Sequence, residues 1–336
     1  MEEVGLGVIG AGRIGKIHAR NLKYLIPGAK LVAISDIVEE AAYQAARELD
    51  IPSVETDHGK LLERKDIRGI VICSSTDTHA DIIEEAAEAG KHIFCEKPIA
   101  LEIPRIEQAL SVVEKAGVKL QVGFNRRFDP SFKKAKQLIE SGEIGVPYVI
   151  RITSRDPAPP PIAYVKSSGG LFLDMMIHDF DMARFLIGDE ISELMAVGDC
   201  LIDPAIGEAG DIDTAIVTLK FKNGVMGAID NSRKTAYGYD QRIEVHGSKG
   251  TITVGNKTPT EVILHNESGI QGDVLLNFFI ERYQDSYLAE MEEFVNCIMN
   301  DEEPSVGGFD GLISVRMGYA ALESLQTKRF VTFEND

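Results

Sequence analysis

Residues 4–122 alternate short runs of β-branched residues with longer helix-like stretches, and this alternation constrains the fold more than any other feature of the sequence. Strands that are separated by helices form right-handed βαβ crossovers, so they lie parallel in one sheet with helices on both faces. The expected strands cover residues 6–9, 31–35, 70–73, 92–95 and 119–122. The expected helices end near residues 24, 49, 89 and 116. This pattern predicts a doubly wound α/β domain over residues 1–123.

The alternation of strands and helices ends at about residue 145, after which strand-like runs follow one another with only turns between them. The runs 214–221 and 225–231 are joined through Asn223-Gly224, which is a strong hairpin signal between alternating runs. A second turn at residues 247–250 separates two further strand-like runs. Helices are expected near residues 170–187, 280–300 and 309–325. Residues 124–336 therefore predict an α+β domain with an open, mostly antiparallel sheet.

The charge balance limits the partners of the chain. Asp and Glu number 53 against 35 Lys and Arg, which gives the 336 residues a net charge of −18. Such a surface repels the phosphates of nucleic acids and anionic lipids, so we expect neither partner. The first residues show no cationic and apolar leader pattern, and no stretch approaches the roughly 18 apolar residues of a membrane span, so we expect a cytoplasmic protein. The 4 cysteines form no C-x-x-C pair and are expected to be reduced.

A glycine-rich turn follows the first expected strand and opens a helix, which is the context of a Rossmann dinucleotide fingerprint. The residues that we assign to the cofactor in this turn are Gly10, Gly12, Arg13, Ile14 and Gly15. Asp36 ends the second strand, where a carboxylate can accept both ribose hydroxyls of the adenosine or can instead cap the next helix. An acid here repels a 2′-phosphate, so the sequence predicts NAD rather than NADP.

A proton-transfer site is predicted on the expected helix over residues 170–187. Asp174, His178 and Asp181 fall at i, i+4 and i+7, which forms one polar stripe on an otherwise apolar helix. An imidazole can accept a proton near neutrality, and a carboxylate one turn away can orient it. We therefore predict His178 as a base with Asp174 as its partner. The alternative is a structural His–Asp pair that caps the preceding turn.

Lys97 is a second candidate, because it directly follows the expected strand over residues 92–95. Ligands of open α/β sheets bind beyond the carboxyl ends of the strands, and an ammonium there can stabilise negative charge on a hydroxyl oxygen. The alternative is a surface lysine in a loop. No HExxH and no metal-ligand spacing occurs among the 7 histidines, and no G-x-S-x-G is present, so we predict neither a catalytic metal nor acyl transfer.

These motifs, together with Glu96-Lys97-Pro98 and with Gly169-Gly170 ahead of Asp174, resemble the glucose-fructose oxidoreductase / inositol dehydrogenase / rhizopine catabolism (Gfo/Idh/MocA) family over residues 4–330. The runs 125–129, 154–161, 177–184 and 237–240 are similar to inositol 2-dehydrogenases. The resemblance implies oxidation of the axial hydroxyl of myo-inositol to scyllo-inosose, with NAD as hydride acceptor and no metal. It also implies an NAD-binding domain, a substrate-binding domain and a homotetramer that assembles through the open sheet.

The resemblance assigns roles residue by residue. It makes His178 the base and Asp174 its partner, and Lys97 holds the reacting or neighbouring hydroxyl. Further polyol contacts that it implies are Arg127, Asp156, Tyr239 and Tyr283. Further cofactor contacts that it implies are Ser74, Thr76, His79 and Glu96, with Ser75 in place of the family's proline. Three alternatives remain open: a dehydrogenase of another cyclic polyol or aldose, a glycosidase that uses tightly held NAD, and a non-catalytic NAD-binding regulator.

Overall fold

The computed structural model describes residues 3–333, which form two compact units. Residues 3–128 and 285–315 make up the first unit, and residues 129–284 and 316–333 make up the second. The boundary near residue 128 lies close to the expected one at 123. Residues 285–315, which we expected in the second domain, pack with the first, because a helix far along the chain completes its core. Within the described residues, no helix is long and apolar enough to cross a membrane.

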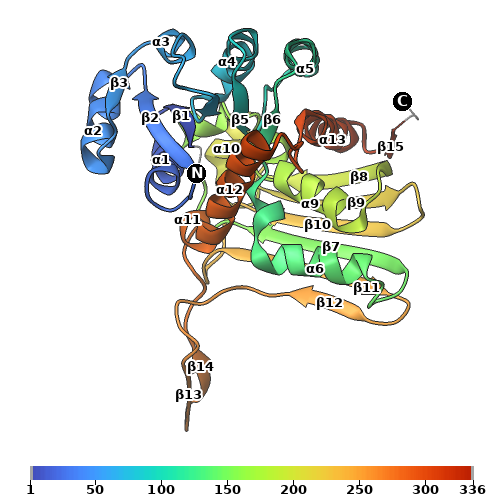
Figure 1. The fold of residues 1–336 in the computed structure, drawn as a ribbon. Coiled ribbons are helices and arrows are strands. Elements are labelled where there is room, and N and C mark those ends of the chain that lie inside the picture. The colour runs from blue at the N-terminus through green and yellow to red at the C-terminus, as the bar shows by residue number, and fades with distance from the viewer. Residues whose placement is uncertain (1–2, 334–336) are drawn as a thin grey trace. The chain divides into compact units, whose positions relative to one another are not determined.

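The first unit contains a six-stranded parallel sheet in the order β3-β2-β1-β4-β5-β6, so the predicted doubly wound fold is confirmed (Figure 1). Its strands are β1 (Val4–Ile9), β2 (Ala29–Ser35), β3 (Ser53–Glu55), β4 (Gly69–Ile72), β5 (His92–Glu96) and β6 (Leu120–Gly123). Its helices are α1 (Arg13–Tyr24), α2 (Glu39–Leu49), α3 (Gly59–Leu62), α4 (Thr76–Glu88), α5 (Ile103–Ala116), the 3-10 helix η1 (Asn125–Phe128) and α12 (Gln284–Asn300). We did not expect β3, because this edge strand has only three residues, all half-buried.

The core of the first unit joins distant parts of the chain. All six residues of β1 are buried, as expected for a central parallel strand with helices on both faces. Four apolar residues of α12 enter the same core cluster, and they are Met291, Phe294, Val295 and Ile298. Since each is at most 3% exposed, α12 belongs to the hydrophobic core of the first unit and is not an addition to its surface.

The second unit contains a seven-stranded sheet in the order β12-β11-β7-β10-β9-β8-β15. Only β7 and β10 pair in parallel, so the predicted mostly antiparallel sheet is confirmed. Its strands are β7 (Pro147–Arg155), β8 (Ile191–Asp199), β9 (Thr214–Phe221), β10 (Met226–Ser232), β11 (Asp240–Gly247), β12 (Thr251–Val254) and β15 (Val331–Thr332). Its helices are α6 (Pro130–Glu140), α7 (Ile162–Val165), α8 (Gly170–Asp174), α9 (Ile177–Ile187), α10 (Pro204–Glu208) and α11 (Phe279–Arg282), and α13 (Gly308–Thr327) crosses between the units. Along β9 every second residue is buried, which is the pattern of a sheet with one covered face.

The predicted single helix over residues 170–187 is wrong, because the chain breaks it into α8 and α9 at Met175 and Met176. The N–H groups of both methionines point to the carbonyl oxygen of Leu171, at 3.1 and 2.9 Å. The helical hydrogen-bond ladder therefore gains one residue at this point, as in a π-bulge. Asp174 ends α8 and His178 lies in the first turn of α9, so they do not share one continuous polar stripe.

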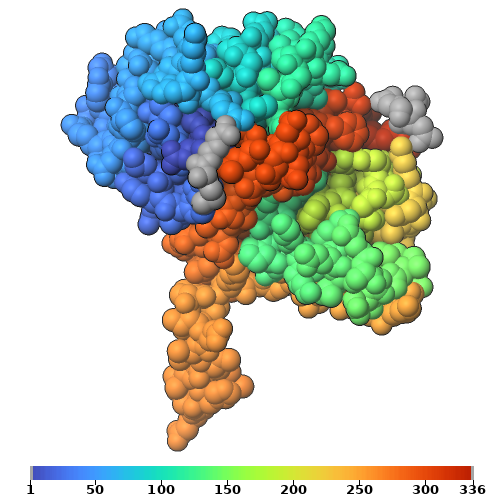
Figure 2. Space-filling view, in the orientation of Figure 1, coloured from blue at the N-terminus to red at the C-terminus, as the bar shows by residue number. Residues whose placement is uncertain are grey.

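A separate hairpin extends from the second unit. It consists of β13 (Ile263–Asn266) and β14 (Gly269–Gly272), and all eight residues are exposed. Figure 2 shows the hairpin as a narrow arm. Two strands alone are marginally stable in water, so the stability of this hairpin depends on the segments that join it to the second unit.

Candidate active site

The three glycines of the fingerprint meet three different environments. Gly10 has φ +101°, and a Cβ there would lie 2.5 Å from the backbone of Cys73. A Cβ on Gly15 would lie 1.9 Å from the carbonyl oxygen of Gly10. At Gly12, in contrast, nothing lies within 4 Å of the same position. Packing requires glycine at positions 10 and 15, whereas Gly12 leaves open space where α1 begins. Arg13 and Ile14 form the first turn of α1, which contains no acidic residue.

The open space at Gly12 fits the pyrophosphate of a dinucleotide. The first N–H groups of a helix have no partner within the helix, and they attract an anion. Gly12 is the N-cap of α1, and no side chain caps this end. The residues present therefore fit the group that the fingerprint predicts.

Asp36 connects the end of β2 to the fingerprint. Its Oδ2 accepts the N–H of Ala11 at 2.7 Å, and its Oδ1 accepts the N–H of Val38 at 2.8 Å. Val38 is the N-cap of α2, and no side chain caps this helix. Asp36 therefore bonds to the residue just before the helix and does not cap the helix itself. Each carboxylate oxygen has a further lone pair, which can accept a ribose hydroxyl.

His79 joins the loops that follow β4 and β5. Its Nδ1 lies 2.8 Å from the carbonyl oxygen of Pro98, and its Nε2 lies 3.1 Å from that of Ser74. Burial lowers the pKa of His79, which favours the neutral ring. Thr76 begins α4, next to these loops. Since Pro98 directly follows Lys97, the His79 ring supports the segment that carries Lys97.

Arg127 is held by an ion pair in the first unit. It lies on η1, and its Nη2 donates to Asp310 Oδ1 at 2.7 Å. Its Nη1 also lies 3.4 Å from the carbonyl oxygen of Ser305. The resemblance implied that Arg127 contacts a polyol, and the observed ion pair fixes where its guanidinium lies.

Asp174 is held by two donors in the second unit. Its Oδ1 accepts the hydroxyl of Tyr164 at 2.8 Å, and its Oδ2 accepts Arg233 Nη1 at 3.0 Å. Asp156 Oδ2 lies 4.0 Å from the same Nη1. Arg233 is buried, so this cation compensates the carboxylate charge inside the protein. Burial and then the charge of Asp174 raise the pKa of Tyr164, which keeps this hydroxyl a donor.

A buried polar network holds the helix that carries His178. Asp179, the next residue, accepts Ser154 Oγ at 2.5 Å and Asn231 Nδ2 at 2.8 Å. Gln241 Oε1 lies 3.0 Å from the same Ser154 hydroxyl. These bonds tie α9 to β7, β10 and β11, which orients the start of α9. No sequence pattern reveals this network, because its members come from four separate elements.

Tyr239 and Tyr283 lie together in the interior of the second unit. Their rings meet edge to face with centroids 6.1 Å apart, and they are 6% and 2% exposed. The Tyr283 hydroxyl lies 3.4 Å from Gln241 Oε1, at the edge of the network around Asp179. The structure thus brings these two predicted residues together. Arg233 and Tyr164 could not be predicted from helical spacing, because they lie outside the helix that carries Asp174.

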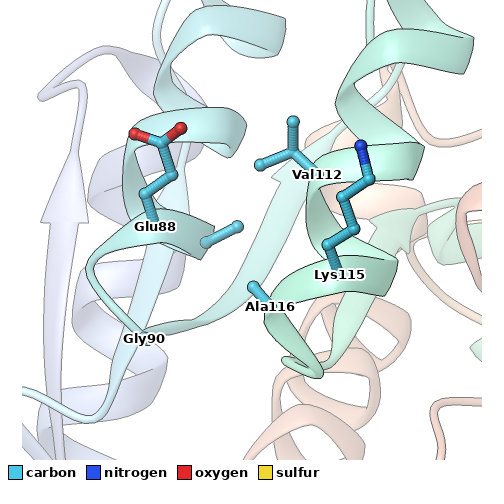
Figure 3. A pocket seen from close by; sticks show the side chains of 6 residues that line it. Glu88, Gly90, Val112, Lys115 and Ala116 are labelled. Carbon is cyan, nitrogen blue, oxygen red and sulfur yellow. The ribbon is translucent and has the colours of Figure 1, made fainter.

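A shallow depression elsewhere in the first unit is a poor candidate for the site. It lies between the C-terminal ends of α4 and α5 (Figure 3). The residues that line it are Ala87, Glu88, Gly90, Val112, Lys115 and Ala116. Since Gly90 precedes β5, the depression is at the amino end of this strand, whereas ligands of such sheets bind at the carboxyl ends.

Comparisons with known proteins agree with this arrangement over the whole chain. Residues 4–124 match the model of an oxidoreductase family, NAD-binding Rossmann fold, and residues 136–333 match its C-terminal alpha/beta domain. The chain is 50% identical to a myo-inositol 2-dehydrogenase of Thermotoga maritima, covering 98% of both chains. It is 44% identical to an inositol 2-dehydrogenase of Rhizobium meliloti, covering 98% of this chain and 99% of that protein.

A solved structure with a bound cofactor is also similar. The scyllo-inositol dehydrogenase of Lactobacillus casei with bound NAD(H) and scyllo-inositol has a TM-score of 0.92 and 35% sequence identity. The alignment covers 98% of this chain and 99% of that one.

Proposed function

This chain belongs to the Gfo/Idh/MocA oxidoreductase family, and from that premise we propose that it is an NAD-dependent inositol 2-dehydrogenase, which oxidises myo-inositol to scyllo-inosose. Its first unit is an NAD-binding Rossmann domain, so NAD is its cofactor. The observation that carries the proposal is the likeness, over nearly the full length of both chains, to a protein named for this activity. The compensated acid Asp174, just before His178, supports the same chemistry.

In the proposed reaction, His178 accepts the hydroxyl proton of the substrate at a ring nitrogen. Asp174, fixed by Tyr164 and Arg233, is the proposed partner that orients this ring. Lys97 donates a hydrogen bond to the reacting or neighbouring oxygen. NAD, when bound, would supply the acceptor for the hydride of the same carbon, and Gly12 at the start of α1 and Asp36 would hold it. Arg127, Asp156, Tyr239 and Tyr283 are proposed polyol contacts.

The test is NADH formation by the purified protein with NAD and separate additions of myo-inositol, scyllo-inositol, D-chiro-inositol, glucose and galactose. We expect the highest kcat/KM with myo-inositol. Preference for another inositol or for an aldose would overturn the proposed substrate and keep the dehydrogenase chemistry. Binding of NAD with no reduction by any of these compounds would overturn the activity and favour the glycosidase or the regulator.

The cofactor preference rests on Asp36. Since like charges in contact cost several kcal/mol, Asp36→Ser is expected to raise the ratio of kcat/KM with NADP to that with NAD by about tenfold or more. Val38→Ala, on the exposed segment that follows, is the matched control and leaves this ratio unchanged. Equal activity of the unaltered enzyme with both cofactors would contradict the assignment.

Assembly and location complete the proposal. Ile216 on β9 and Met226 on β10 are 54% and 55% exposed, so the outer face of the second sheet carries apolar residues that a second copy can cover. We propose a homotetramer assembled through this face, and light scattering that gives the mass of one chain would overturn it. None of the four cysteines forms a disulfide, which fits the reducing cytoplasm that we propose as its location.

A further inference from the structure

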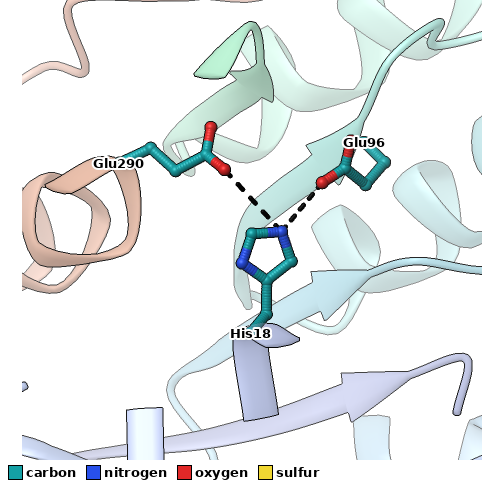
Figure 4. Close-up of side chains that lie close together, drawn as sticks. All are labelled: His18, Glu96 and Glu290. Carbon is teal, nitrogen blue, oxygen red and sulfur yellow. Dashed lines mark hydrogen bonds and ion pairs between the residues drawn. The ribbon is translucent and has the colours of Figure 1, made fainter. Parts of the chain in front are cut away.

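Three titratable side chains of the first unit meet in its interior, and only Glu96 among them has an assigned role, as an expected cofactor contact. His18 lies on α1, Glu96 ends β5 and Glu290 lies on α12, and Figure 4 shows both carboxylates directed at the same imidazole. His18 Nε2 lies 2.8 Å from Glu96 Oε1 and 3.8 Å from Glu290 Oε1. The side chains of His18 and Glu290 are 0% exposed, and that of Glu96 is 16% exposed.

The surroundings of this cluster are aromatic and apolar. The His18 ring meets the rings of Phe94 and Tyr287 edge to face, with centroids 5.1 and 5.7 Å away. Among the described residues, neither carboxylate oxygen of Glu290 has a hydrogen-bond partner. The titratable groups that face Glu290 are His18, Glu96, Glu293 and Cys73. Burial, followed by the charges of Glu96 and Glu293, raises the pKa of Glu290 well above its usual range.

The charge of the cluster decides its protonation. With both carboxylates ionised and the imidazole neutral, two negative charges would lie within 4.8 Å of each other in an apolar interior. Burial of unpaired charge costs several kcal/mol per ion, so such a group takes up protons instead. A neutral Glu290 removes one of these two negative charges from the interior, and the other carboxylate, that of Glu96, lies 2.8 Å from His18 Nε2.

The cluster also anchors the segment that carries Lys97. Glu96 immediately precedes Lys97, and its carboxylate lies between the His18 ring and β6. His18 holds Oε1, while on β6 a Cβ at Gly123 would lie only 3.0 Å from Oε2, so glycine leaves the room that Glu96 occupies. Two residues before Gly123, the amide of Gln121 donates to the backbone carbonyl of Glu290 at 2.8 Å, which locks α12 onto the same strand.

We propose that Glu290 is a neutral carboxylic acid in the folded protein, and that Glu290 and His18 are positioning residues that fix Glu96 and thereby the backbone at Lys97. The part that concerns Lys97 rests on the proposed function. The part that concerns protonation does not, so the two are tested separately.

The first experiment compares thermal unfolding of the full-length protein and of Glu290→Gln between pH 5 and 9. An acid whose folded-state pKa is raised stabilises fully only below its unfolded value of 4.5, and this stability is lost as the pH rises through the folded value. Glutamine has nearly the same shape and is neutral throughout. We therefore expect the Tm of the unaltered protein to fall relative to Glu290→Gln as the pH rises.

The matched control for this experiment is Glu292→Gln, two residues further along α12 on a partly exposed position. Its Tm difference from the unaltered protein is expected to be the same at every pH. A pH-independent difference for Glu290→Gln as well would overturn the neutral-acid assignment. A second result would also overturn this assignment: Zn²⁺ raises the Tm of the EDTA-treated unaltered protein but not that of Glu290→Gln. The three side chains would then be metal ligands.

The second experiment tests positioning with His18→Leu, which removes the donor to Glu96, and His18→Gln, which keeps one. Displacement of a reacting group by about 1 Å costs about 100-fold in rate, so we expect a kcat loss of tenfold or more in His18→Leu with KM for NAD nearly unchanged. His18→Gln is expected to restore most of the loss. Unchanged kcat in His18→Leu, or no rescue by glutamine, would overturn the positioning role.

If His18→Leu does not fold, His18→Met, which also lacks a hydrogen-bond donor, replaces it, with the same expected split between kcat and KM. Failure of the proposed function is recognised separately, because the unaltered enzyme would then reduce no NAD with any inositol. The unfolding experiment needs no substrate and still decides the protonation of Glu290.

Discussion

The two units of this protein build their sites in different ways. In the first unit, the proposed nucleotide site is made largely of backbone: Gly10 and Gly15 allow close approaches and Gly12 leaves open space, all within six consecutive residues. In the second unit, Asp174 is held by side chains from elsewhere, among them Arg233 at a separation of 59 residues. A backbone site depends on short sequence motifs, whereas a side-chain site depends on how separate elements pack.

The largest expected effect lies in the side-chain site, at His178. Loss of a general base typically costs about 10²–10⁴-fold in rate, so His178→Ala is expected to lower kcat by this amount. Affinity for NAD is expected to stay within about threefold, because the base acts only in the chemical step. The measurements are steady-state NADH formation and a fluorescence titration with NADH. An equal loss of cofactor affinity would contradict the separation of the two sites.

Arg233→Met comes next, because it leaves Asp174, whose side chain is only 11% exposed, without its compensating cation. Removal of one partner of a buried pair destabilises by about 3–5 kcal/mol, and a Tm measurement detects this. The double variant with Asp174→Asn no longer contains the unpaired charge and is expected to recover part of the stability. No recovery would show that Arg233 stabilises the protein by packing alone.

Gly12→Ala tests the backbone site and has the smallest expected effect. Nothing lies within 4 Å of its missing Cβ, so the Tm is expected to stay unchanged. The added methyl group occupies the open space at the start of α1, and we expect the Kd for NADH to rise about tenfold, which corresponds to 1.4 kcal/mol. Gly15→Ala is the contrasting variant, since its Cβ meets the Gly10 carbonyl oxygen at 1.9 Å and is expected to destabilise the fold. A lower Tm for Gly12→Ala would contradict the distinction between the open space at Gly12 and the close packing at Gly15.

The difference between a backbone site and a side-chain site also explains how much of the structure could be predicted from the sequence. Apart from β3 and α3, the order of strands and helices over residues 4–123 follows from local periodicity, and the fingerprint and Asp36 occur together within the first 36 residues. The break between α8 and α9 depends on one carbonyl, that of Leu171, which meets two N–H groups, and no residue type in the sequence signals it. Arg233 and Asp179 find their partners only after β7, β10 and α9 have packed together.

The buried cluster of His18, Glu96 and Glu290 is an exception to this difference between the units, because it is a side-chain cluster in the first unit. His18 and Glu96 are 78 residues apart, and Glu290 is farther along the chain still. The unit with the predictable backbone site thus contains a side-chain cluster that no local pattern could reveal. Long-range packing limits prediction in both units.

The place of α12 in the first unit has a consequence for how the protein is made. A ribosome releases the chain from the N-terminus, so β1 to β6 emerge well before Met291 and Phe294, which complete their core. Residues 129–284 of the second unit also emerge before α12. The parallel sheet that is synthesised first therefore closes its core late, and its apolar surface stays exposed to other nascent chains until about residue 300 has left the ribosome.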